Sequence, residues 1–183
     1  MSRSVLRQQL LERRARFASS DEATPANTAL ALHLATLLGE LEPDLLGLYW
    51  PHRSEFNAAA ALRDDNPLAR LPMALPFAHR SPNEMHYRAW NGHAPTLLDE
   101  CGIPACEGAT VVPDVVLVPC VGFTADDFRL GYGGGFFDRW LARHADVISV
   151  GVAWSISEIA PGDFEPQSHD RALTLIVTER GVA

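Results

Sequence analysis

The segment from Arg129 to Asp138, Arg-Leu-Gly-Tyr-Gly-Gly-Gly-Phe-Phe-Asp, brings together residue types that could do chemistry. Four of the five residues from Gly131 to Gly135 are glycine, so backbone N–H groups can approach a ligand closely. A helix expected after the glycines offers the positive end of its dipole to an anion. Asp138, in its first turn, could hold Mg²⁺ against phosphates that Arg129 helps to neutralise. The pattern predicts a phosphate-binding loop, with a flexible turn as the alternative.

A second group of candidates is a cluster of five arginines near the N-terminus, one third of the 15 cations in the chain: Arg3, Arg7, Arg13, Arg14 and Arg16. They form either a solvated helix face or a cationic clamp for an anionic ligand, which the planar fork of arginine donors suits. Arg3 and Arg7 are four residues apart and share one helical face.

The chain contains no lysine, and this absence excludes several mechanisms. A Walker A loop needs its lysine, and Schiff-base or pyridoxal chemistry needs an amine nucleophile. A dinucleotide fingerprint is also disfavoured, because Phe136 stands where its last glycine belongs. A bound phosphate must therefore be held by arginine, by backbone N–H groups or by a metal.

Hydrophobic periodicity predicts the elements that must position these residues. In the first two thirds of the chain it predicts helices over 4–18 and 27–41, the second capped by Thr24 or Asn27 and ended by Pro43, a helix start at 58–61, and strands over 45–50, 71–77 and 85–90.

The last third is the clearest part of the pattern. It predicts strands over 115–119, 147–153 and 173–177, with a helix over 136–144. A strand, a loop, a helix and a strand in this order indicate a parallel βαβ unit. We therefore expect an α/β fold with one domain over residues 1–183.

Composition limits the partners. The net charge of −8 argues against broad nucleic-acid binding, and no apolar run approaches the roughly 20 residues that span a bilayer. Three cysteines suggest reduced thiols and a cytoplasmic protein. Cys101 and Cys106 have no nearby histidine at zinc-finger spacing, so a structural zinc is not expected.

The glycine segment carries a resemblance to a known family. The run 117–123 followed by 129–139 resembles the signature of 5-formyltetrahydrofolate cyclo-ligases, also called methenyltetrahydrofolate synthetases. The resemblance covers nearly the whole chain, and its further pieces are Arg3 with Arg7, Tyr49-Trp50 with Glu55, and His169-Asp170.

The resemblance implies a role for each matching residue. It implies ATP contacts for Arg3, Arg7, Arg129, Leu130, Gly131, Tyr132, Gly133, Gly134, Gly135, Phe136 and Phe137. It implies folate contacts for Trp50 and Glu55, and metal ligation by Asp138 and Asp170. The implied fold is a three-layer α/β sandwich with a mostly parallel central sheet.

The implied activity is ATP- and Mg²⁺-dependent conversion of 5-formyltetrahydrofolate to 5,10-methenyltetrahydrofolate, with release of ADP and phosphate. The substrate is a reduced folate that can carry a polyglutamate tail, and a monomer without nucleic-acid or membrane partners is expected.

The chain departs from the family pattern at several positions. Arg3 stands where lysine is usual, Thr124 replaces an aspartate, Asp127 a glycine and Phe137 a tyrosine, and the usual Glu-Pro is missing after Ile103. These departures keep two alternatives open: a catalytically weakened folate- or nucleotide-binding protein of the same fold, and a different kinase or ligase of small metabolites.

Overall fold

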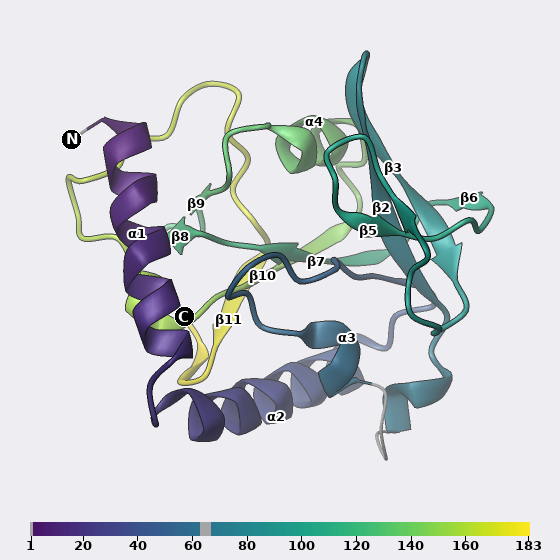
Figure 1. The fold of residues 1–183 in the computed structure, drawn as a ribbon, viewed down its shortest axis with the longest axis horizontal. Helices are drawn as coiled ribbons and strands as arrows, with labels where there is room; N and C mark the ends of the chain where they lie inside the picture. The colour runs from purple at the N-terminus through teal and green to yellow at the C-terminus, as the bar shows by residue number, and fades with distance from the viewer. Residues whose placement is uncertain (1, 63–66) are drawn as a thin grey trace.

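The computed structural model describes residues 2–62 and 67–183, and its centre is an eight-stranded sheet in the order β12-β11-β10-β7-β1-β2-β3-β6 (Figure 1). The helices are α1 (Arg3–Ala18), α2 (Ala23–Leu41), α3 (Ala58–Ala61) and α4 (Phe136–Arg143), with 3₁₀ turns η1 (Pro67–Arg70) and η2 (Ser155–Ser157). The strands of the large sheet are β1 (Leu46–Gly47), β2 (Met73–Arg80), β3 (Asn83–Trp90), β6 (Thr110–Val111), β7 (Val115–Pro119), β10 (Ile148–Val152), β11 (Leu175–Thr178) and β12 (Gly181–Val182). Two small antiparallel pairs are β4 (Leu97–Leu98) with β5 (Pro104–Ala105), and β8 (Gly122–Phe123) with β9 (Arg129–Leu130).

The five central strands run parallel. β11, β10, β7, β1 and β2 pair in parallel, and the antiparallel strands β12, β3 and β6 extend the two sides. From β1 the chain continues to β2 on one side and later to β7 on the other, so the winding direction reverses between β1 and β7. In open parallel sheets, ligands bind beyond the carboxyl ends of the strands at such a reversal point.

The sheet is covered on both faces, which makes three layers. α2 and α3 lie below the sheet in Figure 1, and α4 lies above it. Side chains along β7 point alternately to the two faces of the sheet. Val115 and Leu117 pack with Leu34 and other residues of α2 on one face, whereas Val116 and Val118 pack with Trp140 of α4 on the other. The predicted three-layer sandwich with a mostly parallel sheet is confirmed, and so is the βαβ unit formed by β7, α4 and β10.

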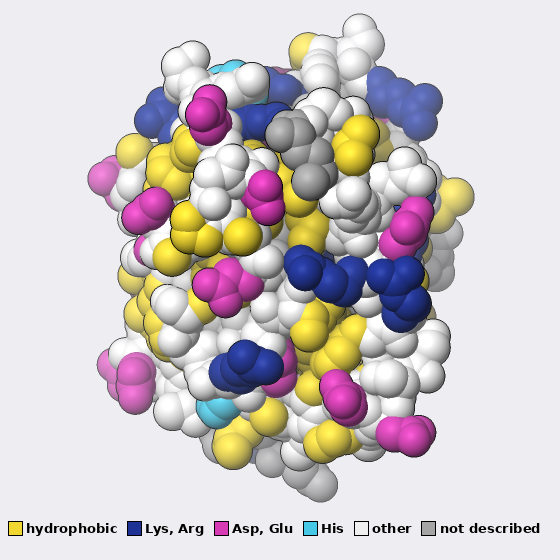
Figure 2. Space-filling model, turned by 90° about the vertical axis from the view of Figure 1, so that its left-hand side faces the viewer, with side chains coloured by type: hydrophobic (Ala, Val, Ile, Leu, Met, Phe, Trp, Pro, Cys, Tyr) yellow, Lys and Arg dark blue, Asp and Glu magenta, His cyan; other side chains and the backbone are white. Residues whose placement is uncertain are grey.

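α1 lies across the end of the sheet (Figure 1). It packs through Leu6 and Leu10 in a third apolar cluster with Val121, Leu130 and Ile159. This small cluster holds the N-terminal arginines next to the loops that follow β7 and β9. Figure 2, which shows this side of the molecule, has basic and acidic side chains scattered among apolar ones.

Several element boundaries differ from the sequence prediction. α2 begins at Ala23, so Thr24 and Asn27 lie inside the helix, and Glu22 occupies the cap position without a side-chain hydrogen bond. The helix ends at Glu42, which is left-handed with φ 48°, directly before Pro43. The strand predicted over 45–50 pairs only at Leu46–Gly47.

The two strands predicted in the middle of the chain are longer than expected and form an antiparallel hairpin, with Met73 opposite Trp90 and Arg80 opposite Asn83. The three cysteines are free thiols. Within residues 2–62 and 67–183, no helix has the length and apolar character to cross a membrane.

Candidate active site

A cavity of about 550 Å³ lies beyond the carboxyl ends of β1 and β7, at the reversal point of the sheet. Tyr49 and Trp50 follow β1, Pro119 ends β7, and Pro76 and Ala78 come from β2. All fifteen residues predicted to contact ATP, folate or metal line this one cavity. The structure therefore brings the predicted positions together, while their roles as ligand contacts stay predictions.

The glycine loop connects β9 to α4 and lies against the N-terminal helix. Gly133 and Gly135 have φ of 98° and 66°, backbone conformations that side chains other than glycine rarely adopt. The Arg7 Nε donates a 2.6 Å hydrogen bond to the Gly131 carbonyl, and a Cβ built on Gly133 would lie 3.5 Å from the Arg7 guanidinium. Burial, followed by the charge of Arg3, lowers the pKa of Arg7. The loop and Arg7 together place donors along one wall of the cavity.

Both carboxylates predicted to hold metal are ion-paired with predicted phosphate-binding arginines. Asp170 accepts hydrogen bonds from Arg3 at 2.5 and 3.1 Å, and the Oδ1 of Asp138 lies 3.0 Å from Nη2 of Arg129. The hydrogen bond to Asp170 raises the pKa of Arg3, and the charge of Asp138 also raises it. Arg3 is therefore bonded to Asp170, which lies in the loop before β11, and is also influenced by the charge of Asp138 in the first turn of α4.

The pKa of the Asp170 carboxyl is depressed by its hydrogen bonds. Burial alone would raise the pKa of this carboxyl, but the hydrogen bonds from Arg3 and from the Gln167 backbone N–H outweigh it. Among the described residues, no group of three or more histidine, cysteine or acidic side chains converges as a metal site. Asp138 and Asp170 suit Mg²⁺ in another way, because this ion is usually held by one or two carboxylates together with substrate phosphates and water.

Glu55 is the acidic side chain on the opposite part of the cavity. Its side chain is 4% exposed, and burial raises the pKa of its carboxyl. Four groups lower the pKa of Glu55: the His52 backbone N–H donates to Oε2 at 2.7 Å, the Tyr132 hydroxyl donates to Oε1 at 2.8 Å, and the charges of Arg14 and Arg53 act from nearby. A buried carboxylate with fixed donors on one side offers its remaining lone pairs to a ligand.

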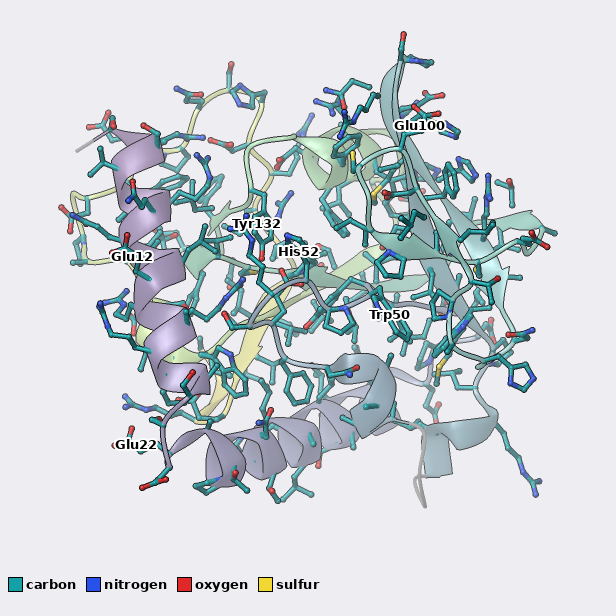
Figure 3. The ribbon with its side chains drawn as sticks, viewed as in Figure 1. Glu12, Glu22, Trp50, His52, Glu100 and Tyr132 are labelled. Carbon is teal, nitrogen blue, oxygen red and sulfur yellow. The ribbon has the colours of Figure 1, made fainter. Side chains whose placement is uncertain are left out.

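Aromatic rings border Glu55. The Trp50 and Trp90 rings meet edge to face with centroids 6.1 Å apart, and Trp50 is half-buried. Figure 3 shows Tyr132 and His52 close together between α1 and the β2–β3 hairpin, with ring centroids 5.5 Å apart, and Trp50 further along the same side. This part of the cavity offers flat apolar surfaces beside one acidic acceptor.

Sequence reasoning missed several residues of the site. His52, Asp99 and Gln167 line the cavity without having been singled out, and Asp99 shapes the wall by accepting from the Ala78, Cys101 and Ile103 backbone N–H groups.

Arg14 was named only as one of five clustered arginines, yet it is 1% exposed and contacts both Tyr132 and Glu55. A signal for it was present. At 100° per residue, Arg14 lies on the same face of α1 as Arg3 and Arg7, whereas Arg13 and Arg16 point elsewhere.

The fold and the cavity define an α/β protein with a cavity at the carboxyl ends of parallel strands, and a glycine loop, arginines and acidic side chains form its walls. A sequence profile described as the 5-formyltetrahydrofolate cyclo-ligase family matches residues 1–179. The chain belongs to this family of enzymes, which confirms the resemblance found in the sequence.

Individual relatives agree with this assignment. The chain is 37% identical to a 5-formyltetrahydrofolate cyclo-ligase of Mycoplasma pneumoniae over 67 residues, which is 36% of this chain and 39% of that protein. It is 25% identical to the Haemophilus influenzae protein of the same name over 145 residues, 73% of this chain and 76% of the relative.

Two solved structures share the fold. The 5,10-methenyltetrahydrofolate synthetase of Mycoplasma pneumoniae superposes with a TM-score of 0.75 at 24% identity, covering 98% of this chain and 99% of the other. The synthetase of Aquifex aeolicus gives a TM-score of 0.76 at 25% identity, covering 100% and 92%.

Proposed function

We propose that the protein converts 5-formyltetrahydrofolate to 5,10-methenyltetrahydrofolate with consumption of ATP and release of ADP and phosphate. The observation that carries the proposal is the cavity itself. It joins a glycine loop and three arginines at one end to a buried acceptor with aromatic neighbours at the other. A triphosphate and a pterin need these two environments within reach of each other.

The reaction requires activation of a poor electrophile. The N5-formyl group is an amide, so its oxygen must first become a leaving group. Transfer of the γ-phosphoryl group to that oxygen forms an O–P bond and releases ADP. N10 of the folate then attacks the formyl carbon, and phosphate leaves with the oxygen. Most of the protein's contribution is positioning and charge neutralisation.

The anionic half of this task falls to residues at the glycine-loop end. Arg3, Arg7 and Arg129 would neutralise phosphate oxygens, together with the backbone N–H groups of the loop. Asp138 and Asp170 would hold Mg²⁺, whose charge would further neutralise the phosphates. Both carboxylates are paired with arginines, so binding of Mg²⁺ and phosphate would exchange these partners, with the arginines turning to phosphate.

The folate half falls to residues around Glu55. Its carboxylate would accept hydrogen bonds from the amino and ring N–H donors of the pterin, and Trp50 would cover an aromatic face of the ligand. We also propose that the substrate can carry a polyglutamate tail, that the protein acts as a monomeric single domain, and that it works in the cytoplasm, where its three free thiols would stay reduced.

The departures from the family pattern bear on how active the enzyme is. Asp127 holds a left-handed φ of 60°, which explains why glycine is usual there, and Phe137 keeps its ring 5.9 Å from the Arg129 guanidinium although it lacks the hydroxyl of tyrosine. Neither of these two changes removes a charged group from the cavity, and Thr124, where an aspartate is usual, is not among the residues that line it. On this ground we favour an active enzyme over a binding protein that has lost turnover.

One assay tests the proposal. Purified protein is incubated with 5-formyltetrahydrofolate, ATP and Mg²⁺, and the near-ultraviolet absorbance of the conjugated methenyl product is followed. Time-dependent absorbance that requires both ATP and folate is expected. Binding of both ligands without product would instead identify a catalytically weakened binding protein, and binding of ATP alone would point to a different small-metabolite kinase or ligase.

A further inference from the structure

Arg14 is a buried cation that is not among the predicted ligand contacts. Its guanidinium donates to the Tyr132 hydroxyl at 2.5 Å, to Ser54 Oγ at 3.3 Å and to the Cys120 carbonyl at 3.4 Å. Its Nη1 is 3.8 Å from Oε1 of Glu55, too long for a direct hydrogen bond. Tyr132 therefore stands as a bridge between the two charged groups.

The direction of the hydrogen bonds along this bridge is fixed by chemistry. A guanidinium has no acceptor, so Arg14 must donate and the Tyr132 oxygen must accept. The single Tyr132 proton is then free to point away from Arg14. Its candidate acceptors are Oε1 of Glu55 at 2.8 Å and the His52 carbonyl at 3.5 Å, and the shorter contact takes the proton.

The ends of the bridge belong to different parts of the cavity. Arg14 lies on α1, the helix that carries Arg3 and Arg7, whereas Tyr132 belongs to the glycine loop and Glu55 to the loop after β1. With Oε1 held by Tyr132 and Oε2 by the His52 backbone N–H, the carboxylate cannot rotate without losing a hydrogen bond.

We propose that Arg14 is a positioning residue that, through Tyr132, keeps Glu55 ionised and oriented toward the pterin part of the cavity. The pterin assignment of that part rests on the proposed function. The same contacts connect Tyr132 of the glycine loop to Glu55 on the proposed folate side of the cavity. Arg14 therefore influences the geometry of both the glycine loop and the Glu55 carboxylate.

All charged and titratable groups around Glu55 fit this role. Arg14 and Arg53 are the nearby cations, and His52 belongs to the same loop. The remaining neighbours are phenols and a thiol whose pKa values are raised by burial and by the Glu55 charge: Tyr49, Tyr132 and Cys120. These three groups are neutral at physiological pH. Within the described residues, the negative charge of Glu55 is therefore stabilised by the arginines and by hydrogen-bond donors.

The experiment measures the Glu55 carboxyl directly. Its ¹³C NMR shift is followed through a pH titration of the ligand-free protein, in the native chain and in the Arg14→Gln, Arg14→Lys, Tyr132→Phe and Arg16→Gln variants. Arg14→Gln and Tyr132→Phe should raise the Glu55 pKa by about one unit, since each removes a stabiliser of the charged form. Arg14→Lys should recover part of the shift, because it keeps the charge but not the fork of donors. Arg16→Gln removes an exposed cation of the same helix and should leave the titration unchanged.

Kinetics provide the second measurement. Arg14→Gln should raise the KM for 5-formyltetrahydrofolate about tenfold or more, a usual result of disturbing a buried charged hydrogen bond, and should move the acid side of its pH profile upward. The KM for ATP should rise less. A purely structural residue would lower the melting temperature without moving the Glu55 titration or the ratio of the two KM values, and that result would overturn the proposal.

The two proposals can fail separately. If the native protein makes no methenyl product, the proposed function fails, while the NMR titration still decides whether Arg14 controls the charge of Glu55. If the native protein turns over and Glu55 titrates identically in Arg14→Gln and Tyr132→Phe, the positioning role alone is wrong. Should Arg14→Gln not fold, Arg14→Lys and Tyr132→Phe decide the question.

Discussion

Replacing Asp138 by asparagine separates a metal-binding role from a structural one. The change keeps the size of the side chain and an acceptor oxygen, but it removes the charge opposite Arg129, 3.0 Å away. The Arg129 side chain is only 4% exposed and that of Asp138 19%, so little water can replace the lost charge. Arg129 keeps one other acceptor, the Arg171 carbonyl at 3.3 Å.

The expected loss of stability follows from these contacts. An asparagine oxygen would still accept from the charged Arg129 guanidinium, but the pair loses one of its two charges, which costs about 1 kcal/mol on the scale of about 1.5–3 kcal/mol for hydrogen bonds to charged groups. The lost interaction with the helix dipole adds about 0.3–1 kcal/mol. A total of about 1.3–2 kcal/mol corresponds to a fall of about 3–8 °C in melting temperature for a chain of this size. The interaction of Asp138 with the helix dipole, taken alone, would predict a smaller loss of stability.

The effect on turnover should be much larger. Loss of a charge-stabilising group lowers kcat about 10²-fold or more, and a weakened Mg²⁺ site can be partly refilled by raising the Mg²⁺ concentration. The assay follows methenyl product at several Mg²⁺ concentrations, with melting measured by calorimetry. Asp146→Asn is the matched control, because it removes an exposed carboxylate just beyond the other end of α4. An Asp138→Asn protein that melts earlier but turns over normally at every Mg²⁺ concentration would refute the metal-binding role.

Three further predictions concern other parts of the cavity. Arg7→Ala loses the hydrogen bond to Gly131 and a cation, so steady-state kinetics should show a KM for ATP about tenfold higher, with a stability loss of about 0.5–1.5 kcal/mol by calorimetry; an unchanged KM would exclude the clamp. Because the folded pKa of Asp170 is depressed, its contribution to stability is present above the unfolded pKa of about 3.9 and is lost as the pH falls through the folded value. Arg3→Gln should therefore lower the melting temperature at neutral pH but lose less of it as the pH falls, so that its curve approaches the native one at low pH; two parallel curves would contradict the pairing. Asp127→Gly should raise the free energy of unfolding by about 1 kcal/mol, since glycine adopts the left-handed φ without strain; denaturant unfolding measures this, and a loss of stability would contradict it.

The last third of the chain was predictable because its signals are local. The apolar run at Val115–Pro119, the amphipathic segment at Phe136–Arg143 and the apolar run containing Ile148–Val152 each fix one element, and their order fixes the parallel connection. The glycine loop was equally readable, because its composition has few alternative explanations.

Other parts of the fold left too weak a signal. Two-residue strands such as β4, β5 and β8 show no periodicity, and their pairing depends on partners elsewhere in the chain. The early start of α2 was missed because Glu22 makes no side-chain cap. Helical spacing places Arg14 on the face of Arg3 and Arg7, but its partner Tyr132 lies 118 positions later, and no local pattern identifies that partner.

The wall that holds the arginines is built from opposite ends of the chain, which affects how the protein reaches its native state. Arg3 meets its partner Asp170 across 167 positions, and Arg7 meets Gly131 across 124. Closing such long loops carries a large entropic cost, so contacts of this kind tend to form late, after the hairpin and the parallel strands have brought the ends near each other. As a peripheral element, α1 is expected to open at a lower free-energy cost than the core strands, which amide hydrogen exchange would measure. A ligand that bridges α1 and the glycine loop would close this opening, and slower amide exchange in α1 would report its arrival.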